Sequence, residues 1–221
     1  MKRTILSALM TILVPACVFA VDGVVLINQS TVVAAGWFPY HITQPGSYKL
    51  SGSLEPPRNV VAMSIDADNV SLDLNGFTVS CPILLNGLGA VPAYCILSTG
   101  ANTSIHNGKV VIKEDGALGS SSTNQYGGLI ALGSRHRLED LIVDASETVS
   151  PFVSGIVSQG KGSIVRGNTV TVAHPDNSIS QALIVHTCPS LVQDNYASSR
   201  LILQGFGLCF SSNNFSDTGP F

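Results

Sequence analysis

Four segments of the chain contain the side chains best suited to binding a ligand. The segments are 79–92, 113–127, 144–154 and 173–181, and the side chains are those of Glu114, Asp115, Tyr126, Asp144, Glu147, His174 and Asp176. Carboxylates, an imidazole and a phenol can hydrogen-bond to a polar ligand such as a sugar. We therefore expect a ligand-binding surface along these segments. The alternative interpretation is that they are solvated or only cover the edge of a sheet.

The densest charged stretch supplies the candidates for catalysis. It reads "RHRLED" over residues 135–140 and is followed by Asp144. A polysaccharide lyase needs an Arg or Lys base beside carboxylates, and a glycosidase needs two carboxylates roughly 5–10 Å apart. Arg137, Asp140 and Asp144 are the candidates, because strands about 4.8 Å apart can bring side chains from successive units together. A solvated turn with local ion pairs is the alternative.

Two aspartates are candidates for a metal site. Asp66 and Asp68 lie in "DADNV", and calcium binds hard oxygen ligands. The same residues also favour a turn before a strand. The histidines share no common spacing and no CxxC pair accompanies the cysteines, so we expect no zinc or copper site. Calcium is the one cofactor left open, and the absence of a GxSxG motif argues against a serine hydrolase.

Composition indicates the fold class that must position these residues. The chain has 221 residues with a formal net charge of −3, and only 11% of them are charged, about half the usual share. Solvated amphipathic helices need many Lys and Glu residues on their exposed face, and this chain has few. We therefore predict an all-β protein. No cluster of basic residues suggests nucleic acid as a partner.

The first twenty residues are expected to be a secretory signal peptide. Lys2 and Arg3 precede an apolar run over 5–14, and "VFA" over 18–20 provides a cleavage site. Cys17 in "VPAC" offers the alternative of a lipid anchor. No second long apolar run follows, so no transmembrane span is expected. The predicted location is periplasmic or extracellular.

Six units repeat along the remainder of the chain. Each starts at an apolar anchor, and ten or eleven residues later five of the six units carry an asparagine. The anchors are Ile65, Ile96, Ile130, Val157, Ile184 and Ile202, and the asparagines are Asn75, Asn107, Asn168, Asn195 and Asn213. The unit with Leu141 breaks the row. Asn tolerates left-handed backbone and its amide both donates and accepts hydrogen bonds, so stacked units would form an amide ladder.

The units hold the strand core constant and vary the loops, which is typical of a right-handed parallel β-helix. We expect about six coils over 62–221, with 21–61 as an N-terminal cap in which residues 32–35 supply part of a short helix. The four segments listed first leave the coil at equivalent points, so they would stack along one edge.

The opening of the repeat resembles a known family. "HITQPGSYKLSGSL" followed by "IDADNVSLDLNGFTV" is similar to the start of exported bacterial proteins with the pectin-lyase-like right-handed parallel β-helix fold. The resemblance implies fold more strongly than function. The WxDH-like and RxPxxR-like signatures of pectate lyases are absent, as are the NTD, DD, GHG and RIK signatures of polygalacturonases.

Four cysteines remain after the leader, and an even number in an exported protein favours disulfides. Three connectivities are possible. We favour Cys81–Cys95, which flank one loop, and Cys188–Cys209, which lie in successive units. Free buried thiols are the alternative.

Two functions follow as expectations. The first is a non-enzymatic exported module that binds glycan or acts as a surface or structural component. The second is a small polysaccharide lyase or glycoside hydrolase acting on acidic polysaccharide at the loop-lined edge.

Overall fold

The computed structural model describes residues 23–83, 94–114, 126–148, 153–172, 181–204 and 208–217. The predicted signal peptide over 1–20 and Cys17 lie outside these ranges. The elements are α1 (Gln29–Ala34) and the strands β1 (Val24–Ile27), β2 (Tyr40–Ile42), β3 (Gly46–Leu50), β4 (Met63–Ile65), β5 (Val70–Asp73), β6 (Thr78–Ile83), β7 (Tyr94–Ser98), β8 (Ser104–Glu114), β9 (Tyr126–Ala131), β10 (Arg137–Glu147), β11 (Val153–Ser158), β12 (Ile164–Arg166), β13 (Thr169–Val172), β14 (Gln181–Val185), β15 (Leu191–Gln193), β16 (Tyr196–Ala197), β17 (Arg200–Leu203), β18 (Phe210–Ser212) and β19 (Phe215–Ser216).

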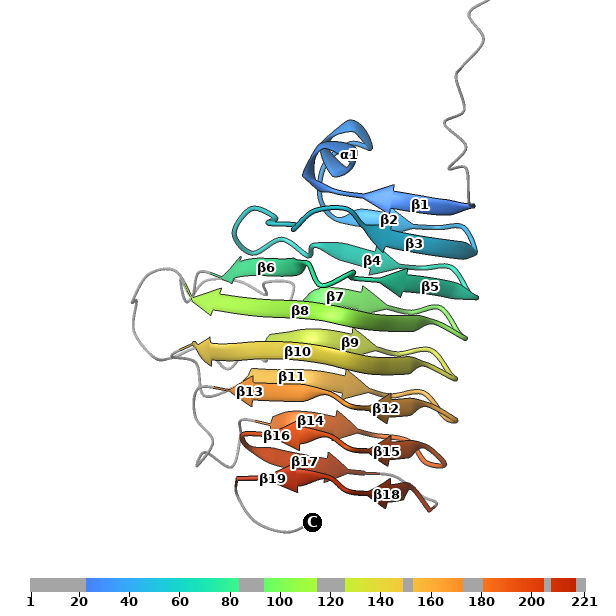
Figure 1. Cartoon of the computed structure of the whole chain (residues 1–221), viewed down its shortest axis with the longest axis vertical. Coiled ribbons are helices and arrows are strands. Elements are labelled where there is room, and N and C mark those ends of the chain that lie inside the picture. Colours follow the sequence, from blue (N-terminus) through green and yellow to red (C-terminus); the bar gives the residue numbers. More distant parts are fainter. Residues whose placement is uncertain are drawn as a thin grey trace, which may run out of the picture.

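The strands form two parallel sheets that the chain visits in turn (Figure 1). The first sheet runs β1-β3-β5-β8-β10-β12-β15-β18, and β6, β13, β16 and β19 extend it sideways. The second sheet runs β2-β4-β7-β9-β11-β14-β17. Each return to the first sheet adds one circuit to the stack. The all-β prediction is confirmed, and the long parallel sheets are consistent with the predicted parallel β-helix.

The core consists of apolar residues stacked in register. One buried row pairs Leu72 with Ile105, Ile105 with Leu138, Leu138 with Val165 and Val165 with Val192. All five are fully buried, and each such side chain contributes roughly 1.5–3 kcal/mol relative to exposure. An apolar residue about eight positions past each anchor predicts this row from the sequence, at Leu138, Val165, Val192 and Phe210. Phe210 departs from it, because it pairs with Leu191 and is 66% exposed. It points outward because Ser211 takes the inward position opposite Val192.

Two bends recur from circuit to circuit, and most of them are set by residues with left-handed backbone. The first bend leads from the second sheet to the first, and the second bend interrupts the first sheet. Non-glycine residues rarely adopt positive φ, and Asn and Asp do so at the lowest cost. The first bend uses Asn69, Asn102, Arg135 and Gly162, and the second uses Asn75, Asn107, Asp140, Gly167, Asp194 and Asn213. The first bend between β14 and β15, over the described residues 186–190, has no such residue.

The inward residue of the second bend follows the left-handed one. In the later circuits it is Asn168, Asn195 and Asn214, and their amides form the ladder. Asn168 Nδ2 donates to Asn195 Oδ1 at 2.9 Å, and Asn195 Nδ2 donates to Asn214 Oδ1 at 2.9 Å. In the two preceding circuits Gly108 and Leu141 take the equivalent position. The amide ladder therefore occupies only the later part of the stack.

The predicted ladder is thus corrected at three positions. Asn75, Asn107 and Asn213 are left-handed bend residues, one place before the inward position. Asn75 Nδ2 donates to the Leu50 carbonyl and Asn107 Nδ2 to Asp73 Oδ1. For Asn107 the physical reason is register, because Leu97, and not Ile96, pairs with Ile130. For Asn213 the anchor pairs as predicted, Ile202 with Ile184, but the last unit has one more residue before the bend, so Ser212 pairs with Gln193 and Asn214 aligns with Asn195.

Both disulfides are the predicted pairs. Cys81 on β6 is bonded to Cys95 on β7 with a Cα–Cα distance of 5.7 Å, which ties the first sheet to the second. Cys188 and Cys209 have a Cα–Cα distance of 5.0 Å. Closing loops of this length stabilises a fold by roughly 2–4 kcal/mol each.

The helix α1 lies at the same end of the stack as β1 (Figure 1). It begins after Asn28, whose side chain accepts the backbone N–H groups of Ser30 and Thr31, while the Thr31 hydroxyl accepts the Asn28 N–H. This capping box sets the start of the helix at Gln29, ahead of the part over 32–35 that the sequence predicts. Within the described ranges, no helix has the length and apolar character needed to span a membrane.

Candidate functional site

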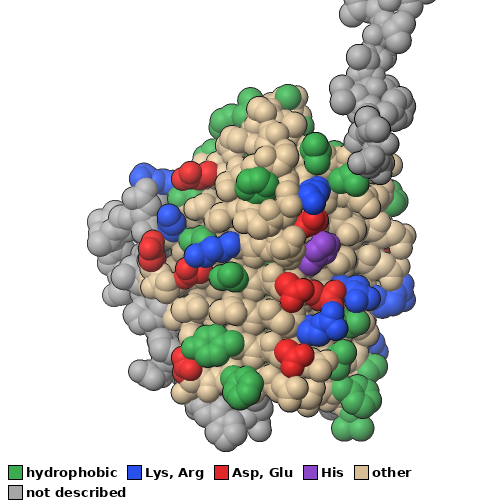
Figure 2. Space-filling model, viewed as in Figure 1, with side chains coloured by type: hydrophobic (Ala, Val, Ile, Leu, Met, Phe, Trp, Pro, Cys, Tyr) green, Lys and Arg blue, Asp and Glu red, His purple; other side chains and the backbone are tan. Residues whose placement is uncertain are grey.

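The outer face of the first sheet carries a row of charges in register. We name Lys49, Asp73, His106, Glu139 and Arg166 the charged row, because each pairs with the next on the neighbouring strand. Lys49 Nζ lies 3.1 Å from Asp73 Oδ2, and Arg166 lies 2.9 Å from Glu139 Oε1. Figure 2 shows basic and acidic side chains gathered around a histidine on this face.

The charged row is largely self-neutralised. Partial burial acts to raise the pKa of Asp73, but hydrogen bonds from the Asn75 N–H, Lys49 and Asn107 lower that pKa below its usual value. The pairs are partly exposed to solvent, so each contributes about 0–1 kcal/mol. Asp73 is therefore ionised at neutral pH and does not provide a proton for acid catalysis.

The structure does not bring the three predicted catalytic residues together. Arg137 Nε donates to Glu139 Oε2 at 3.2 Å. Asp140 is a left-handed residue of the second bend. Asp144 lies beyond that bend, where its carboxylate is 3.0 Å from Lys109 Nζ and accepts the Ser146 hydroxyl. Burial acts to raise the pKa of Asp144, but the bonds from Ser146 and Lys109 lower it.

The predicted ligand-binding residues are described only in part. Asp115, His174 and Asp176 lie outside the described residues, and Glu114 and Tyr126 are the end of β8 and the start of β9. Glu147 is exposed at the end of β10. The strands β6, β8 and β10 extend into three of the predicted insertion segments, so those insertions begin later than the sequence pattern indicates.

The two candidate calcium ligands face different partners. Asp66 accepts the Ser64 hydroxyl at 2.7 Å and lies 2.9 Å from His41 Nδ1, whereas Asp68 accepts the Ala101 N–H at 2.7 Å. In the described part of the chain, no group of three or more His, Cys, Asp or Glu side chains is arranged to hold a metal ion. Asp68 therefore serves the first bend.

His136 is a buried core residue, although the sequence suggests an exposed one. Its side chain is fully buried, and its Nδ1 lies 2.5 Å from the Thr103 hydroxyl. Burial lowers the pKa of His136 to about 4. The imidazole is neutral at neutral pH and out of reach of a ligand on the outer face.

A second outward row ends in exposed aromatic residues that the sequence reasoning missed. Ile142 pairs with Thr169, Thr169 with Tyr196 and Tyr196 with Phe215. Tyr196 is 38% exposed and Phe215 is 69% exposed. The Tyr196 hydroxyl donates to Asp217 Oδ2 at 2.6 Å. We name Tyr196 and Phe215 the aromatic pair. Each directly follows a ladder asparagine, and this "NY" and "NF" spacing is the signal that could have found them.

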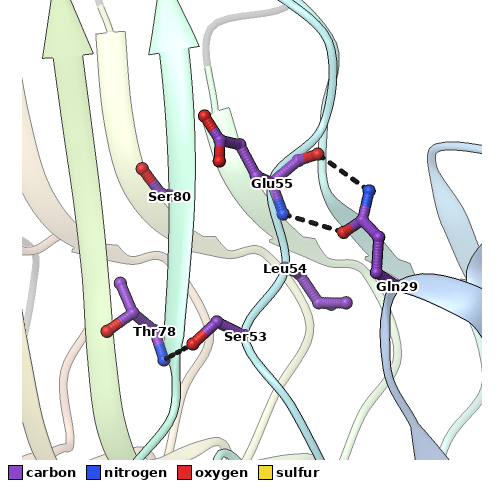
Figure 3. Close-up of a pocket in the computed structure, with 6 residues that line it drawn as sticks. All are labelled: Gln29, Ser53, Leu54, Glu55, Thr78 and Ser80. Atoms are coloured by element: carbon purple, nitrogen blue, oxygen red, sulfur yellow. Dashed lines mark hydrogen bonds between the residues drawn. The ribbon is translucent and has the colours of Figure 1, made fainter.

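A pocket of about 430 Å³ opens where the segment over 53–55 runs beside β6 (Figure 3). Leu54 and Val79 form a parallel bridge and are buried. Alternation along a strand then turns the side chains on either side of them outward. The lining residues are Gln29, Ser53, Leu54, Glu55, Thr78 and Ser80.

Two sets of hydrogen bonds fix the position of the 53–55 segment beside the pocket. The Gln29 amide donates to the Glu55 carbonyl and accepts the Glu55 N–H, both at 3.1 Å. Ser53 Oγ accepts the Thr78 N–H at 3.2 Å. The 53–55 segment is thereby fixed to α1 on one side and to β6 on the other. None of these residues was singled out from the sequence.

Comparisons of the chain with protein-family models, with curated proteins and with solved structures find no match. The resemblance to pectin-lyase-like proteins stays a prediction.

Proposed function

We propose that this protein is an exported, non-enzymatic module that binds glycan on the outer face of its first sheet. The observation that carries the proposal is the aromatic pair, two exposed rings in register on neighbouring strands. Aromatic rings offer a large, rigid apolar surface with polar groups at the edge. The ring faces would pack against the apolar side of a sugar, and Thr169 and Asp217 would hydrogen-bond its hydroxyls.

The fold does not require an aromatic side chain at the outward positions of Tyr196 and Phe215. Thr169 takes the same outward position on the preceding strand and is also exposed, so the position accepts a polar residue. Large exposed aromatic side chains in soluble proteins mark interaction sites when they cluster. A ligand surface is the role that accounts for them.

The finer architecture is part of the same proposal. We infer a right-handed, pectin-lyase-like β-helix of about six coils over 62–221, with 21–61 as its N-terminal cap. The position of α1 beside β1 supports the cap. The two disulfides support export to the periplasm or the cell exterior, because disulfides persist in oxidising compartments.

A second candidate function is a small polysaccharide lyase or glycoside hydrolase. One observation favours it: Asp73, His106 and Glu139 face outward on three successive strands. However, the Asp73 pKa is lowered, and Glu139 is bonded to both Arg137 and Arg166. A glycosidase needs one carboxylic acid whose pKa is raised, and Asp73 does not meet this need.

The test is a calorimetric titration of the chain without its first twenty residues against neutral, amino and acidic oligosaccharides, with and without calcium. We expect saturable binding that falls at least about ten-fold in the variant Tyr196→Ala plus Phe215→Ala. Thr169→Ala is the matched control on the same row, with a smaller loss. Appearance of new reducing ends or of unsaturated products would contradict the non-enzymatic proposal, and loss of those products in Glu139→Gln would favour the second candidate.

A further inference from the structure

We propose that the pocket between α1 and β6 binds a sugar residue that carries a free amino group, at the end of a glycan. The inference rests on the proposed function only in taking glycan as the ligand. It assigns a second site, with its own chemistry, at the opposite end of the outer face from the aromatic pair.

The pocket is preformed, and five of the six residues that line it have polar side chains. Its hydrogen bonds to α1 and β6 use the backbone of Glu55 and of Thr78, and leave the Glu55 carboxylate and the Thr78 and Ser80 hydroxyls facing the opening (Figure 3). These three groups have no hydrogen-bond or ion-pair partner among the described residues. A preformed site loses little conformational entropy when a ligand binds.

The charge of the lining selects the ligand. Glu55 is the one charged residue among the six that line the pocket. A carboxylate attracts an ammonium group and repels a uronic acid, and a charge-assisted hydrogen bond is roughly twice as strong as a neutral one. The ligand is therefore a cationic or neutral sugar and not an acidic one.

The hydroxyls define the remainder of the ligand. Ser53, Thr78 and Ser80 each offer a hydroxyl that donates and accepts, which suits the hydroxyls of a sugar ring better than a simple amine. Leu54 is the apolar contact in the lining. A hexosamine unit satisfies the carboxylate and the hydroxyls together, and the volume of about 430 Å³ admits one such unit.

The test compares glucosamine oligomers, their N-acetylated equivalents and oligogalacturonates on the same protein. We expect the glucosamine oligomers to bind most tightly, and Glu55→Gln to weaken them about ten-fold or more while leaving the N-acetylated oligomers within about two-fold. Ser80→Ala should weaken both amino and N-acetylated oligomers. Glu55 is exposed, so thermal denaturation of Glu55→Gln should match the unaltered protein.

The outcomes separate the pocket from the aromatic pair. Binding that Glu55→Gln abolishes and that Tyr196→Ala only weakens supports the pocket. Glycan binding that is lost in Tyr196→Ala but unchanged in Glu55→Gln and Ser80→Ala overturns the pocket and leaves the proposed function standing. Absence of binding to every oligomer overturns both. Preference for oligogalacturonates overturns the inference about the pocket, since its carboxylate would repel them.

Discussion

The second bend is built differently in the earlier and later circuits of the same stack. In the circuits of β8 and β10 the inward position holds Gly108 and Leu141, and the outer face carries the charged row. In the circuits that follow β12 the inward position holds an amide ladder, and the outer face carries the aromatic pair. The inward position of the bend is apolar in the earlier circuits and polar in the later ones. The left-handed residue sets the bend in both regions, so the interior and the exterior are free to vary around it.

This difference separates residues that the fold needs from residues that it tolerates. A buried amide must be fully bonded, because an unsatisfied buried group costs about 1–3 kcal/mol. An exposed aromatic ring is under no such constraint, so its presence points to function.

Loss of a ladder amide is expected to have the largest effect on stability. The Asn195 side chain is buried and takes part in four hydrogen bonds: its Nδ2 donates to the Val165 carbonyl and to Asn214 Oδ1, and its Oδ1 accepts the N–H and Nδ2 of Asn168. Asn195→Ala should lower the free energy of unfolding by about 4 kcal/mol, measured by urea denaturation. The matched control is Asn107→Gly, which keeps the left-handed bend and should cost less than about 1 kcal/mol. Equal losses in the two variants would mean that the buried ladder contributes no more stability than the exposed hydrogen bond from Asn107 to Asp73.

The apolar version of the bend can be broken by steric overlap. A Cβ atom at Gly108 would lie 2.3 Å from Leu74 Cβ and 3.0 Å from the Phe77 carbonyl oxygen. Gly108→Ala should therefore destabilise the protein by about 2 kcal/mol in the same assay. Leu74→Gly removes the Cβ atom that overlaps, so the double variant Leu74→Gly plus Gly108→Ala should lose less stability than the sum of the two single losses. Strict additivity of the two substitutions would contradict the proposed contact.

The first bend should make the free energy of unfolding depend on pH, because its interior holds His136 beside Thr103. The pKa of His136 is lowered to about 4 from a usual value of 6.5, so the unfolded state binds the proton more readily. The contribution of neutral His136 to the free energy of unfolding is fully present above pH 6.5 and is lost as the pH falls towards 4. Between pH 7.5 and pH 5 we expect a loss of about 2 kcal/mol in urea denaturation.

His136→Ser is the control for the pH effect, since Ser163 and Ser190 follow His136 in the interior of the first bend of later circuits. It should remove most of the pH dependence above pH 5. Asp66, Asp73 and Asp144 have lowered pKa values and lose their contribution only at more acidic pH. A slope that persists unchanged in His136→Ser would assign the dependence to other groups.

The smallest effect is expected at the exposed ladder of the first bend. Asn102 Nδ2 donates to Asn69 Oδ1 at 3.0 Å, and its Oδ1 accepts Arg135 Nε. These groups are exposed and return to water when the bonds are lost, so Asn102→Gly should change the free energy of unfolding by about 0.5 kcal/mol or less. A loss comparable with that of Asn195→Ala would remove the distinction between exposed and buried ladders.

The sequence predicts the repeat well because burial imposes a pattern on it. The row of Leu138, Val165 and Val192 and both disulfides could be found from spacing alone. The register could not be found in the earlier circuits, because Ile96 and Leu97 are both apolar and either can serve as the anchor. Counting from Ile96 places Asn107 in the ladder, whereas the structure pairs Leu97 with Ile130.

The candidate site was less predictable from the sequence because it depends on contacts between residues that are far apart along the chain. The pocket needs Leu54 beside Val79 and Gln29 beside Glu55, and no local pattern indicates these contacts. The charged row likewise needs Asp73, His106 and Glu139 to meet across separate circuits. The aromatic pair was closer to prediction, since Tyr196 and Phe215 each follow a ladder asparagine.

A crystal structure of the protein with its tightest-binding oligosaccharide tests the central claim most directly. We predict sugar rings packed on Tyr196 and Phe215 along the outer face of the first sheet, with every glycosidic bond intact. Sugar bound only on the second sheet, with the aromatic pair uncovered, or a cleaved product beside Asp73 and Glu139, would contradict the account.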